Sequence, residues 1–324
     1  MHAIVCHRYG GPEVMQYEEI SRPEPAHGEI LIQAEAIGVN YVDTMRLSGK
    51  HPLAPQPPFT PGIEVCGRIA AVGDQVQSFH EGDRVIGRCV THGAYAEYVR
   101  VEQRFAASCP HEVSAEEGAA LFVNGQTAYH ALVTIGQLAG GDTVLITAAA
   151  GGVGTCAVQI AKIIGAHVLA AAGTDEKRAL ARRLGADVLI DYTQPAWAEK
   201  VLESTEERGA NLIIESVGGD VARECLKAWA AGGRMVIYGK ANGTPAVFSG
   251  DDVLFGNRTV CGLAVGLVIE DEALMRTAMD QLFTWMGKQR LRLQIGGTYP
   301  LRDAAAAHCD LVGRKTHGKL VLIP

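Results

Sequence analysis

The sequence predicts an α/β protein in which a doubly wound parallel sheet follows a first module made mainly of short strands. Three observations predict this fold. Short β-rich runs separated by Gly, Pro and Asp turns fill about the first 120 residues. Strand and helix patterns alternate from about residue 127 onward, as in parallel sheets covered by helices on both faces. Between them, residues 142–154 join an apolar strand to a glycine-dense turn and a helix pattern.

The first module is predicted from runs of β-branched and apolar residues bounded by turn residues. These runs cover residues 29–36, 63–72, 84–86 and 94–99. Their shortness and close spacing predict a barrel-like all-β module. We expect it to span residues 1–124, with residues 267–324 packing back onto it. That tail is expected to hold a helix over about 271–287 and a final strand over 319–323.

The second module is expected to span residues 125–266 and to contain six strands with helices between them. Such alternation is typical of a doubly wound sheet that binds a nucleotide at the carboxyl ends of its strands. The strands are expected near residues 143–148, 167–172, 187–190, 211–215, 234–238 and 258–262.

The turn at the start of this module predicts where a nucleotide phosphate binds. An unbroken apolar strand leads into it, and the helix pattern that follows begins near Gly152, so the first helical amides lack intrahelical partners. The strand run at 167–172 completes a βαβ unit of about 30 residues, the Rossmann context of such turns. Ala149 takes the place of the first glycine in Gly-x-Gly-x-x-Gly. The alternative is an ordinary loop packed with small residues.

The residues after the second strand of this unit favour NADP over NAD. A carboxylate at that strand end binds the adenosine ribose and repels a 2′-phosphate. The strand ends at Gly173, and Asp175 and Glu176 lie at least two residues beyond the usual place. In this interpretation the Lys177 ammonium group would bind the 2′-phosphate as a point charge. In the alternative interpretation Thr174 caps a helix, the acids suit its dipole, and Lys177 is solvated, although Asp175 contacting a ribose also stays open.

Composition excludes several classes of function. The net charge is −7, from 29 basic and 36 acidic residues, so no electrostatic surface for nucleic acid is expected. No apolar run has the length of a membrane span. The eight cysteines are scattered, without Cys-x-x-Cys or a Cys-His cluster, which predicts reduced thiols in a cytoplasmic protein and no metal site.

Further landmarks lie in both modules and in the tail. They are Gly38-Val39-Asn40-Tyr41-Val42-Asp43, Pro61-Gly62-Ile63-Glu64, Gly82-Asp83-Arg84-Val85, Gly93-Ala94-Tyr95-Ala96-Glu97-Tyr98, Ala148 to Gly154, Glu215-Ser216-Val217-Gly218-Gly219, and Ala307-His308 through His317-Gly318-Lys319. Together they resemble the medium-chain dehydrogenase/reductase superfamily, and within it the zinc-free quinone oxidoreductases related to zeta-crystallin. The resemblance implies a GroES-like first domain and a Rossmann second domain.

The resemblance also implies chemistry without zinc. Zinc alcohol dehydrogenases of the superfamily have a cysteine where this chain has Asn40 and a histidine where it has Ile63, and they carry four closely spaced cysteines that are absent here. Without a Lewis acid, alcohol oxidation is disfavoured. A quinone or an activated alkene accepts hydride with little help, so the protein needs only to bind, orient and exclude water.

The resemblance implies a cofactor site drawn from both modules. Asn40 would line the pocket beside the nicotinamide, and Thr127 would bond the nicotinamide end. The implied cofactor-binding residues are Asn40, Thr127, Gly151, Gly152, Val153, Gly154, Gly173, Lys177, Tyr192, Ser216, Tyr238 and Arg314. Ordinary structural roles are the alternatives, among them a turn asparagine, a threonine bonding its own helical turn, and a tail arginine in a surface ion pair.

Three residues, Asn40, Asp43 and His51, are the catalytic candidates. Many relatives have Gly-x-Tyr-Pro where this chain has Gly49-Lys50-His51-Pro52. In enoyl reductases of this branch a tyrosine in this loop is a proposed proton donor, and a histidine titrating near neutrality could replace it. A solvated loop histidine is the alternative. Met45 stands where many relatives have another tyrosine, and it could equally fill the core.

The sequence therefore predicts an NADPH-dependent reductase of a quinone or another conjugated carbonyl compound. Hydride would pass to this small-molecule substrate in the cleft between the two domains. We expect a homodimer formed by edge pairing of the nucleotide-domain sheets, for which the apolar run at 260–269 is the candidate. Two alternatives stay open. One is a 2-enoyl-thioester reductase, which would need a basic channel, and the other is a non-enzymatic NADPH-binding protein.

Overall fold

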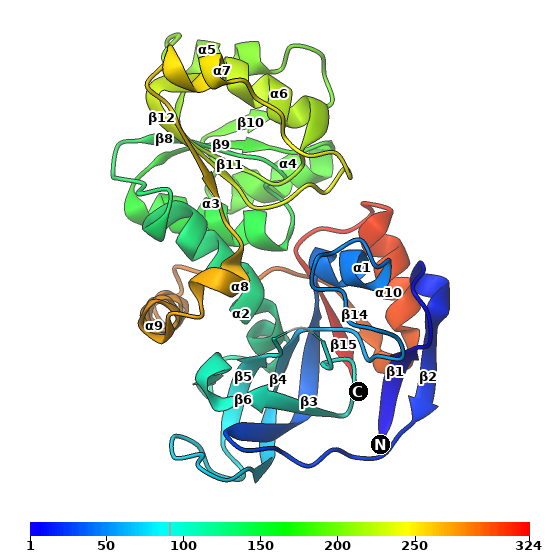
Figure 1. Ribbon diagram of the computed structural model, residues 1–324. Helices are drawn as coiled ribbons and strands as arrows, with labels where there is room; N and C mark the ends of the chain where they lie inside the picture. The colour runs from blue at the N-terminus through cyan, green and yellow to red at the C-terminus, as the bar shows by residue number, and fades with distance from the viewer. Residues whose placement is uncertain (91) are drawn as a thin grey trace. The chain divides into compact units, whose positions relative to one another are not determined.

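The computed structural model describes residues 1–90 and 92–324, which form two compact units (Figure 1). Unit 1 consists of residues 1–123, 271–283 and 293–324, and unit 2 of residues 124–270 and 284–292. Residues 267–270 and 284–292, which we expected with the first module, group with unit 2. Unit 1 is an antiparallel-rich β module and unit 2 a parallel α/β sheet, so the predicted fold class is confirmed.

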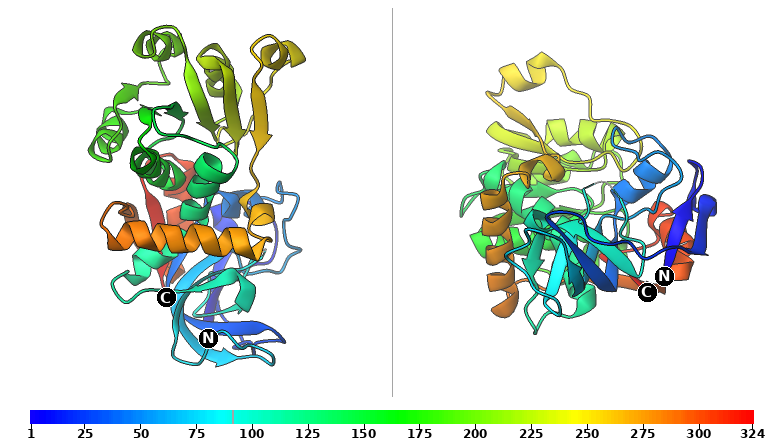
Figure 2. Two further views of the ribbon diagram at one scale, coloured as in Figure 1. Left: turned by 90° about the vertical axis from the view of Figure 1, so that its left-hand side faces the viewer. Right: turned by 60° about the horizontal axis from the view of Figure 1, so that its bottom comes forward.

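Unit 1 is built on a sheet in the order β14-β15-β3-β4-β5-β7, with β6 also paired to β3, and on a separate β1-β2 hairpin. Both chain termini lie side by side in this unit (Figures 1 and 2). Its strands are β1 (His2–Cys6), β2 (Met15–Glu19), β3 (Glu29–Val39), β4 (Glu64–Val72), β5 (Arg84–Arg88), β6 (Tyr98–Glu102), β7 (Ala106–Ser108), β14 (Ile295–Pro300) and β15 (Lys319–Ile323). Its helices include α1 (Tyr41–Leu47) and α10 (Ala304–Val312).

Four elements of unit 1 differ from the prediction. The run at 94–99 joins the sheet only from Tyr98, because Tyr95 N donates to the carbonyl of Pro61 and Ala96 makes one isolated bridge to Ala3. Helix α10 was not predicted, because its four consecutive alanines carry no apolar periodicity. Strand β14 and helix α1 were missed as well, since both are short.

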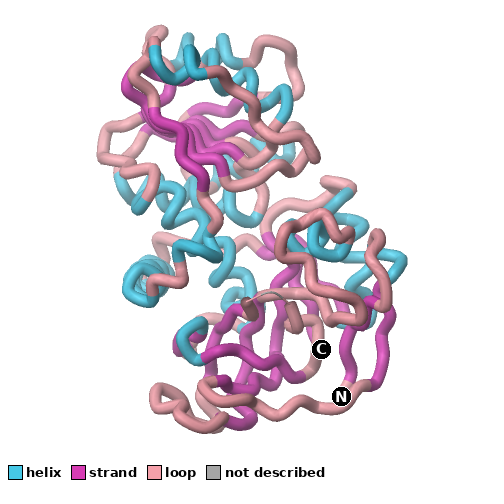
Figure 3. Tube along the Cα trace, in the orientation of Figure 1, coloured by secondary structure: helices cyan, strands magenta, loops and turns pink. Residues whose placement is uncertain are grey.

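Unit 2 contains a six-stranded sheet in the order β10-β9-β8-β11-β12-β13, all parallel, with helices on both faces (Figure 3). All six strands were predicted. They are β8 (Thr143–Ile146), β9 (His167–Ala171), β10 (Val188–Ile190), β11 (Ala210–Glu215), β12 (Trp229–Ile237) and β13 (Thr259–Gly262). The helices are α3 (Gly152–Ile164), α4 (Asp175–Arg183), α5 (Ala198–Ser204), α6 (Gly219–Lys227), α7 (Gly250–Leu254) and α8 (Val265–Val268).

Two long helices, α2 (Ala115–Tyr129) and α9 (Glu272–Gly287), each contribute residues to both units. In the sheet of unit 2 the chain runs outward from β8 to β10 on one side and from β11 to β13 on the other, so the strand order reverses between β8 and β11. Open α/β sheets bind ligands at the carboxyl ends of the strands beside such a reversal. None of the helices in the described part of the chain is long and apolar enough to span a membrane.

Candidate functional site

The predicted cofactor residues of unit 2 gather at the carboxyl ends of four neighbouring strands. The glycine turn follows β8, Gly173 follows β9, Ser216 follows β11 and Tyr238 follows β12. The ends of β8 and β11 are tied together, since Ser216 N donates to Thr147 Oγ1 at 3.1 Å. The strand order therefore brings these residues to the edge where the chain direction reverses, the usual ligand position.

The glycine turn has the close packing that a phosphate cradle needs. Gly151 caps α3 in an extended conformation, and residues 151–153 are partly exposed. A Cβ on Gly154 would lie 2.3 Å from the carbonyl oxygen of Ala148 and 2.7 Å from Ala149 Cα. Only glycine allows α3 to pack against the turn at this distance. The first-turn amides of α3 lack intrahelical acceptors, so they suit an anion there.

The start of α4 combines a helix cap with ion pairs. Thr174 accepts a hydrogen bond from Lys177 N at 3.3 Å, so the predicted N-cap is confirmed. The Asp175 carboxylate is paired with Arg178 at 2.5 Å, and Arg178 also lies 3.1 Å from Asp191. Sequence reasoning missed Arg178. Because Arg178 engages Asp175, an adenosine ribose would have to compete with this ion pair for the Asp175 carboxylate.

Two tyrosines lie beside predicted cofactor residues. A Cβ on Gly173 would be 3.3 Å from the ring of Tyr192, so a side chain at residue 173 would press against that ring. Tyr192 is half-buried and packs against the core of unit 2. Burial raises the pKa of Tyr238 to about 12, and a hydrogen bond with Ser216 opposes the shift.

Helix α2 carries the predicted nicotinamide ligand Thr127, which is buried. One turn earlier, the side chain of Asn124 lies against the start of α3, since a Cβ on Gly152 would fall 2.3 Å from Asn124 Nδ2. Residues three apart share one face of a helix. The face of α2 that holds Thr127 is therefore the face that meets the glycine turn. Asn124 had no role in the sequence-based prediction.

In unit 1 the side chain of Asn40 is fixed by a buried ion pair. Lys319 Nζ lies 2.7 Å from Asn40 Oδ1 and 2.6 Å from Glu64 Oε2. Asn40 Nδ2 donates to the same Glu64 oxygen at 3.2 Å, and Val123 N donates to Glu64 Oε1 at 2.8 Å. The Lys319 and Glu64 side chains are 3% and 0% exposed. Both belong to landmarks in the sequence, but their pairing across 255 residues was not predicted.

A second buried chain of hydrogen bonds reaches the backbone of Asn40. Asp43 Oδ2 accepts from Asn40 N at 2.9 Å and from the Tyr95 hydroxyl at 3.2 Å. His308 Nε2 lies 2.8 Å from the same hydroxyl. The single hydroxyl proton goes to Asp43, so a neutral His308 donates from Nε2 to Tyr95. Burial lowers the pKa of His308 to about 4, in agreement with a neutral ring. Asp43 therefore holds the first turn of α1.

The buried position of Asp43 gives a prediction for the pH dependence of stability. Burial raises the pKa of Asp43 from 3.8 to about 6, against the backbone hydrogen bond from Asn40 and the charges of Arg46 and Lys319. With this raised pKa, the folded protein binds the Asp43 proton more tightly than the unfolded chain does. Protonation therefore stabilises the fold fully below the pKa of the unfolded state, and this stabilisation is lost as the pH rises through about 6. Asp43→Asn removes this dependence. We expect the unfolding free energy of Asp43→Asn minus that of the wild type to rise by about 1 kcal/mol from pH 5 to pH 8.

Urea unfolding at both pH values measures this difference. Tyr299→Phe is the matched control, because Tyr299 donates to the partly exposed Asp310 at 2.8 Å. Its stability difference from the wild type should change little between pH 5 and pH 8. A constant difference for Asp43→Asn across this range would show that Asp43 does not titrate there.

The remaining predicted residues of unit 1 lie at its surface. His51 is half-exposed, and its Nδ1 accepts from Leu53 N at 3.0 Å. Arg314 is exposed and has a positive φ of 56° just after α10. Met45 is half-buried on α1. Their relation to the glycine turn of unit 2 stays a prediction.

The positions of the zinc ligands in alcohol dehydrogenases hold other groups here. Asn40 is bonded to the Lys319 ammonium group, and Ile63 is buried. Among residues 1–90 and 92–324, no group of three or more His, Cys, Asp or Glu side chains could hold a metal ion. The eight cysteines are free thiols.

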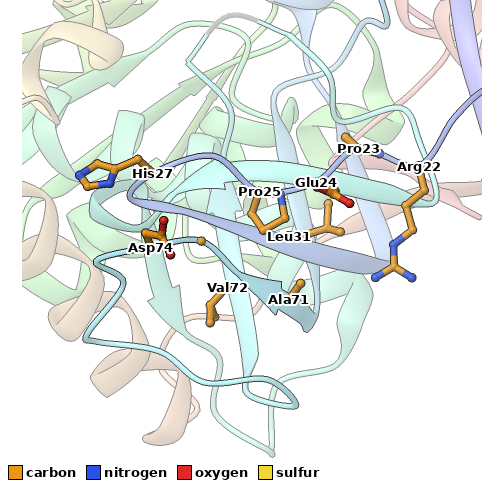
Figure 4. A pocket seen from close by; sticks show the side chains of 10 residues that line it. Arg22, Pro23, Glu24, Pro25, His27, Leu31, Ala71, Val72 and Asp74 are labelled. Carbon is orange, nitrogen blue, oxygen red and sulfur yellow. The ribbon is translucent and has the colours of Figure 1, made fainter.

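Two cavities in unit 1 contain none of the predicted site residues. One, of about 630 Å³, lies between residues 22–27 and the ends of β3 and β4, with the side chains of Arg22 and His27 at its two ends (Figure 4). The other, of about 550 Å³, is lined by residues that include Phe59, His92 and Tyr98. Neither gathers groups suited to hydride chemistry.

Comparison with known proteins gives matches over the whole chain. A model of the alcohol dehydrogenase GroES-like domain matches residues 26–111, and a model of the zinc-binding dehydrogenase family matches residues 152–283. A quinone oxidoreductase of Pseudomonas aeruginosa is 35% identical over 317 residues, which cover 98% of this chain and 97% of that protein.

Two solved structures also match this chain over its whole length. A mycobacterial protein in complex with NADPH has a TM-score of 0.94 and 35% identity over all of both chains. The Escherichia coli quinone oxidoreductase in complex with NADPH has a TM-score of 0.94 and 31% identity, again over all of both chains.

Proposed function

The chain belongs to the zinc-free quinone oxidoreductase branch of the medium-chain dehydrogenase/reductase superfamily, and from this premise we propose that it is an NADPH-dependent reductase of quinones or other electron-poor conjugated carbonyl compounds. The carboxylate-free end of β9 carries the proposal. Gly173 follows that strand, and the nearest acid, Asp175, is paired with Arg178. The residues directly after this strand, Ala172, Gly173 and Thr174, thus include no carboxylate of the kind that an NAD ribose prefers.

The residues of unit 2 fit a dinucleotide. Phosphate would meet the amides of Gly152, Val153 and Gly154 in the first turn of α3, while the Gly151 amide donates to the carbonyl of Ala148 and closes the turn. Gly173, Lys177 and Tyr192 would hold the 2′-phosphate end, with Ser216 and Tyr238 beside the adenosine. Thr127, Asn40 and Arg314 would contact the remainder of the cofactor.

The bound NADPH would supply the hydride, and the chain would orient the acceptor and exclude water. We assign Asn40 to the acceptor side, because Lys319 and Glu64 fix its amide in one orientation. Asp43 would act through Asn40 as a positioning group rather than by contact with the acceptor. His51, whose half-exposed ring lies in the loop after α1, or water would deliver the proton.

Steady-state oxidation of NADPH and NADH with a panel of acceptors tests the proposal. We expect turnover of benzoquinones and enones with NADPH, less with NADH, and none with simple alcohols and NADP⁺. A crotonyl thioester in the same panel separates a quinone reductase from a 2-enoyl-thioester reductase. Preference for NADH, or turnover of alcohols alone, would refute the proposal.

Lys177→Ala is expected to weaken NADPH binding by about 10-fold or more and to change NADH binding less than twofold. The reason is that a charged hydrogen bond to the 2′-phosphate is lost, and NADH has no such group. Fluorescence titration of both cofactors measures the effect. Arg183→Ala, which removes an exposed cation from the last turn of the same helix, should change neither affinity. Equal losses for both cofactors would remove Lys177 from the phosphate site.

We further propose that the protein is a homodimer that pairs through β13. This strand is an unpaired edge of the sheet of unit 2. Large apolar side chains are exposed around it, including Phe255 at 82% and Leu267 at 75%. Exposed apolar groups of this size beside a free strand edge are typical of an interface.

The free thiols at all eight cysteines are consistent with a cytoplasmic protein.

Phe255→Asp is expected to raise the dissociation constant of the dimer by at least about 10-fold, because it would bury a charge in an apolar interface. Sedimentation equilibrium over a range of concentrations measures it. Val312→Asp, at an exposed apolar residue at the end of α10, is the matched control and should leave the dimer intact. A wild-type monomer at micromolar concentration, or equal effects of both substitutions, would contradict this interface.

A further inference from the structure

Asn124 carries a buried hydrogen-bond donor that no group in the described structure satisfies. The residue lies on α2 and is 6% exposed, and its Nδ2 has no hydrogen-bond partner among residues 1–90 and 92–324. A buried donor without an acceptor is costly, so such atoms are rare in native proteins. We therefore expect the Asn124 amide to donate to an acceptor that the described residues do not supply.

The position of the amide indicates where that acceptor lies. A Cβ on Gly152 would fall 2.3 Å from Asn124 Nδ2 and 3.0 Å from its Cγ, so the amide occupies the space that any side chain at residue 152 would need. Gly152 is the first residue of α3, a helix of 13 residues whose first-turn amides have no intrahelical acceptors. The Asn124 donor and these backbone donors therefore lie together at the positive end of one helix.

We propose that Asn124 binds the dinucleotide, with Nδ2 donating a hydrogen bond to an oxygen of its pyrophosphate. This inference rests on the proposed function, which puts NADPH at the glycine turn. An anionic oxygen is the acceptor that both the helix end and the orphaned amide require. An asparagine adds a donor there without adding charge. Because the pyrophosphate is common to both cofactors, Asn124 serves NADPH and NADH alike.

A second amide on the same helix provides the contrast. Gln126 is fully buried, and its Oε1 lies 2.9 Å from His130 Nε2, so this amide has its partner within the protein. Replacing it with leucine strands the ring nitrogen of His130 and should lower stability. Replacing Asn124 with leucine removes a donor that is unsatisfied in the free protein, so it should not lower the stability of that state. The two substitutions therefore separate a ligand-binding amide from a structural one.

The experiment measures cofactor affinity and the stability of the cofactor-free protein for Asn124→Leu, Asn124→Asp and Gln126→Leu. We expect Asn124→Leu to weaken NADPH and NADH by about 10-fold each, the loss of one hydrogen bond to a charged group, while the melting temperature of the free protein stays equal or rises. Asn124→Asp should weaken both cofactors further, since a carboxylate would face the pyrophosphate. Gln126→Leu should melt lower and bind both cofactors within twofold of the wild type.

Binding of 2′-AMP, which has the adenosine phosphate but no pyrophosphate, should be unchanged by Asn124→Leu. Unaltered affinity for NADPH in Asn124→Leu would overturn the inference, and so would a free protein that is destabilised as much as Gln126→Leu or does not fold. A loss confined to NADPH would also overturn it, because it would indicate the 2′-phosphate. Wild-type protein that binds NADPH but turns over no quinone would refute the proposed activity alone and leave this test standing.

Discussion

Lys319→Met should lower the free energy of unfolding by about 3 to 5 kcal/mol, the largest loss that we expect from a single substitution. The ammonium group lies 2.6 Å from Glu64 Oε2, and both side chains are almost fully buried. Removing the cation leaves a buried carboxylate in unit 1 with the neutral donors of Asn40 and Val123. Chemical denaturation measures the change. Quinone turnover should fall as well, because Asn40 Oδ1 loses the donor that orients it.

Two comparisons test the cause of that loss. The double variant Lys319→Met with Glu64→Gln removes the stranded charge and should recover most of the stability. Lys227→Met breaks an ion pair on α6 in which Lys227 is 59% and Glu224 19% exposed, and pairs at the surface contribute about 0 to 1 kcal/mol. If Lys319→Met costs no more than Lys227→Met, the Lys319–Glu64 pair does not stabilise the interior of unit 1.

Gly154→Ala should weaken NADPH binding by at least about 10-fold and cost about 1 to 3 kcal/mol of stability, typical of overpacking. The added methyl group would lie 2.3 Å from the carbonyl oxygen of Ala148, and its other near neighbours are backbone atoms of Ala149. Backbone cannot move aside as a flexible side chain can. The turn and the start of α3 must therefore move apart, which displaces the first-turn amides of α3 relative to the turn. Isothermal titration with NADPH and thermal unfolding measure the two effects.

Gly287→Ala is the control for this substitution. Gly287 also lies in a helix, the last residue of α9, and a Cβ there would meet nothing within 4 Å. Alanine at such a site is neutral or slightly stabilising, because it restricts the unfolded chain. Wild-type affinity for NADPH in Gly154→Ala would mean that the glycine turn does not hold the cofactor.

Local patterns in the sequence were enough to predict the parallel sheet and the glycine turn that joins β8 to α3. Each strand of unit 2 contains a short apolar run, and the final strand of the chain, Lys319–Ile323, was predicted with its exact bounds. The N-cap role of Thr174 followed from residue type and position alone. These features depend on neighbours a few residues away, so a single sequence contains the information.

The buried polar contacts of the site were beyond such reasoning. Lys319 meets Glu64 across 255 residues, and His308 meets Tyr95 across 213. No periodicity links residues so far apart, and a lysine before a final strand resembles any surface lysine. Asn124 was missed for a related reason. What marks it is that its Nδ2 has no acceptor among residues 1–90 and 92–324, and a sequence cannot show an absence that arises from packing.

The most direct test of the central claim is NADPH-driven reduction of a benzoquinone after metal ions have been removed. The protein is treated with a strong chelator, elemental analysis verifies that zinc is absent, and kcat/KM is compared before and after. We expect kcat/KM to be unchanged by the chelator. It should be at least about 10-fold higher with NADPH than with NADH, which is the effect of one charged hydrogen bond to the 2′-phosphate. Loss of activity on chelation with recovery on adding Zn²⁺, or equal use of both cofactors, would contradict this account.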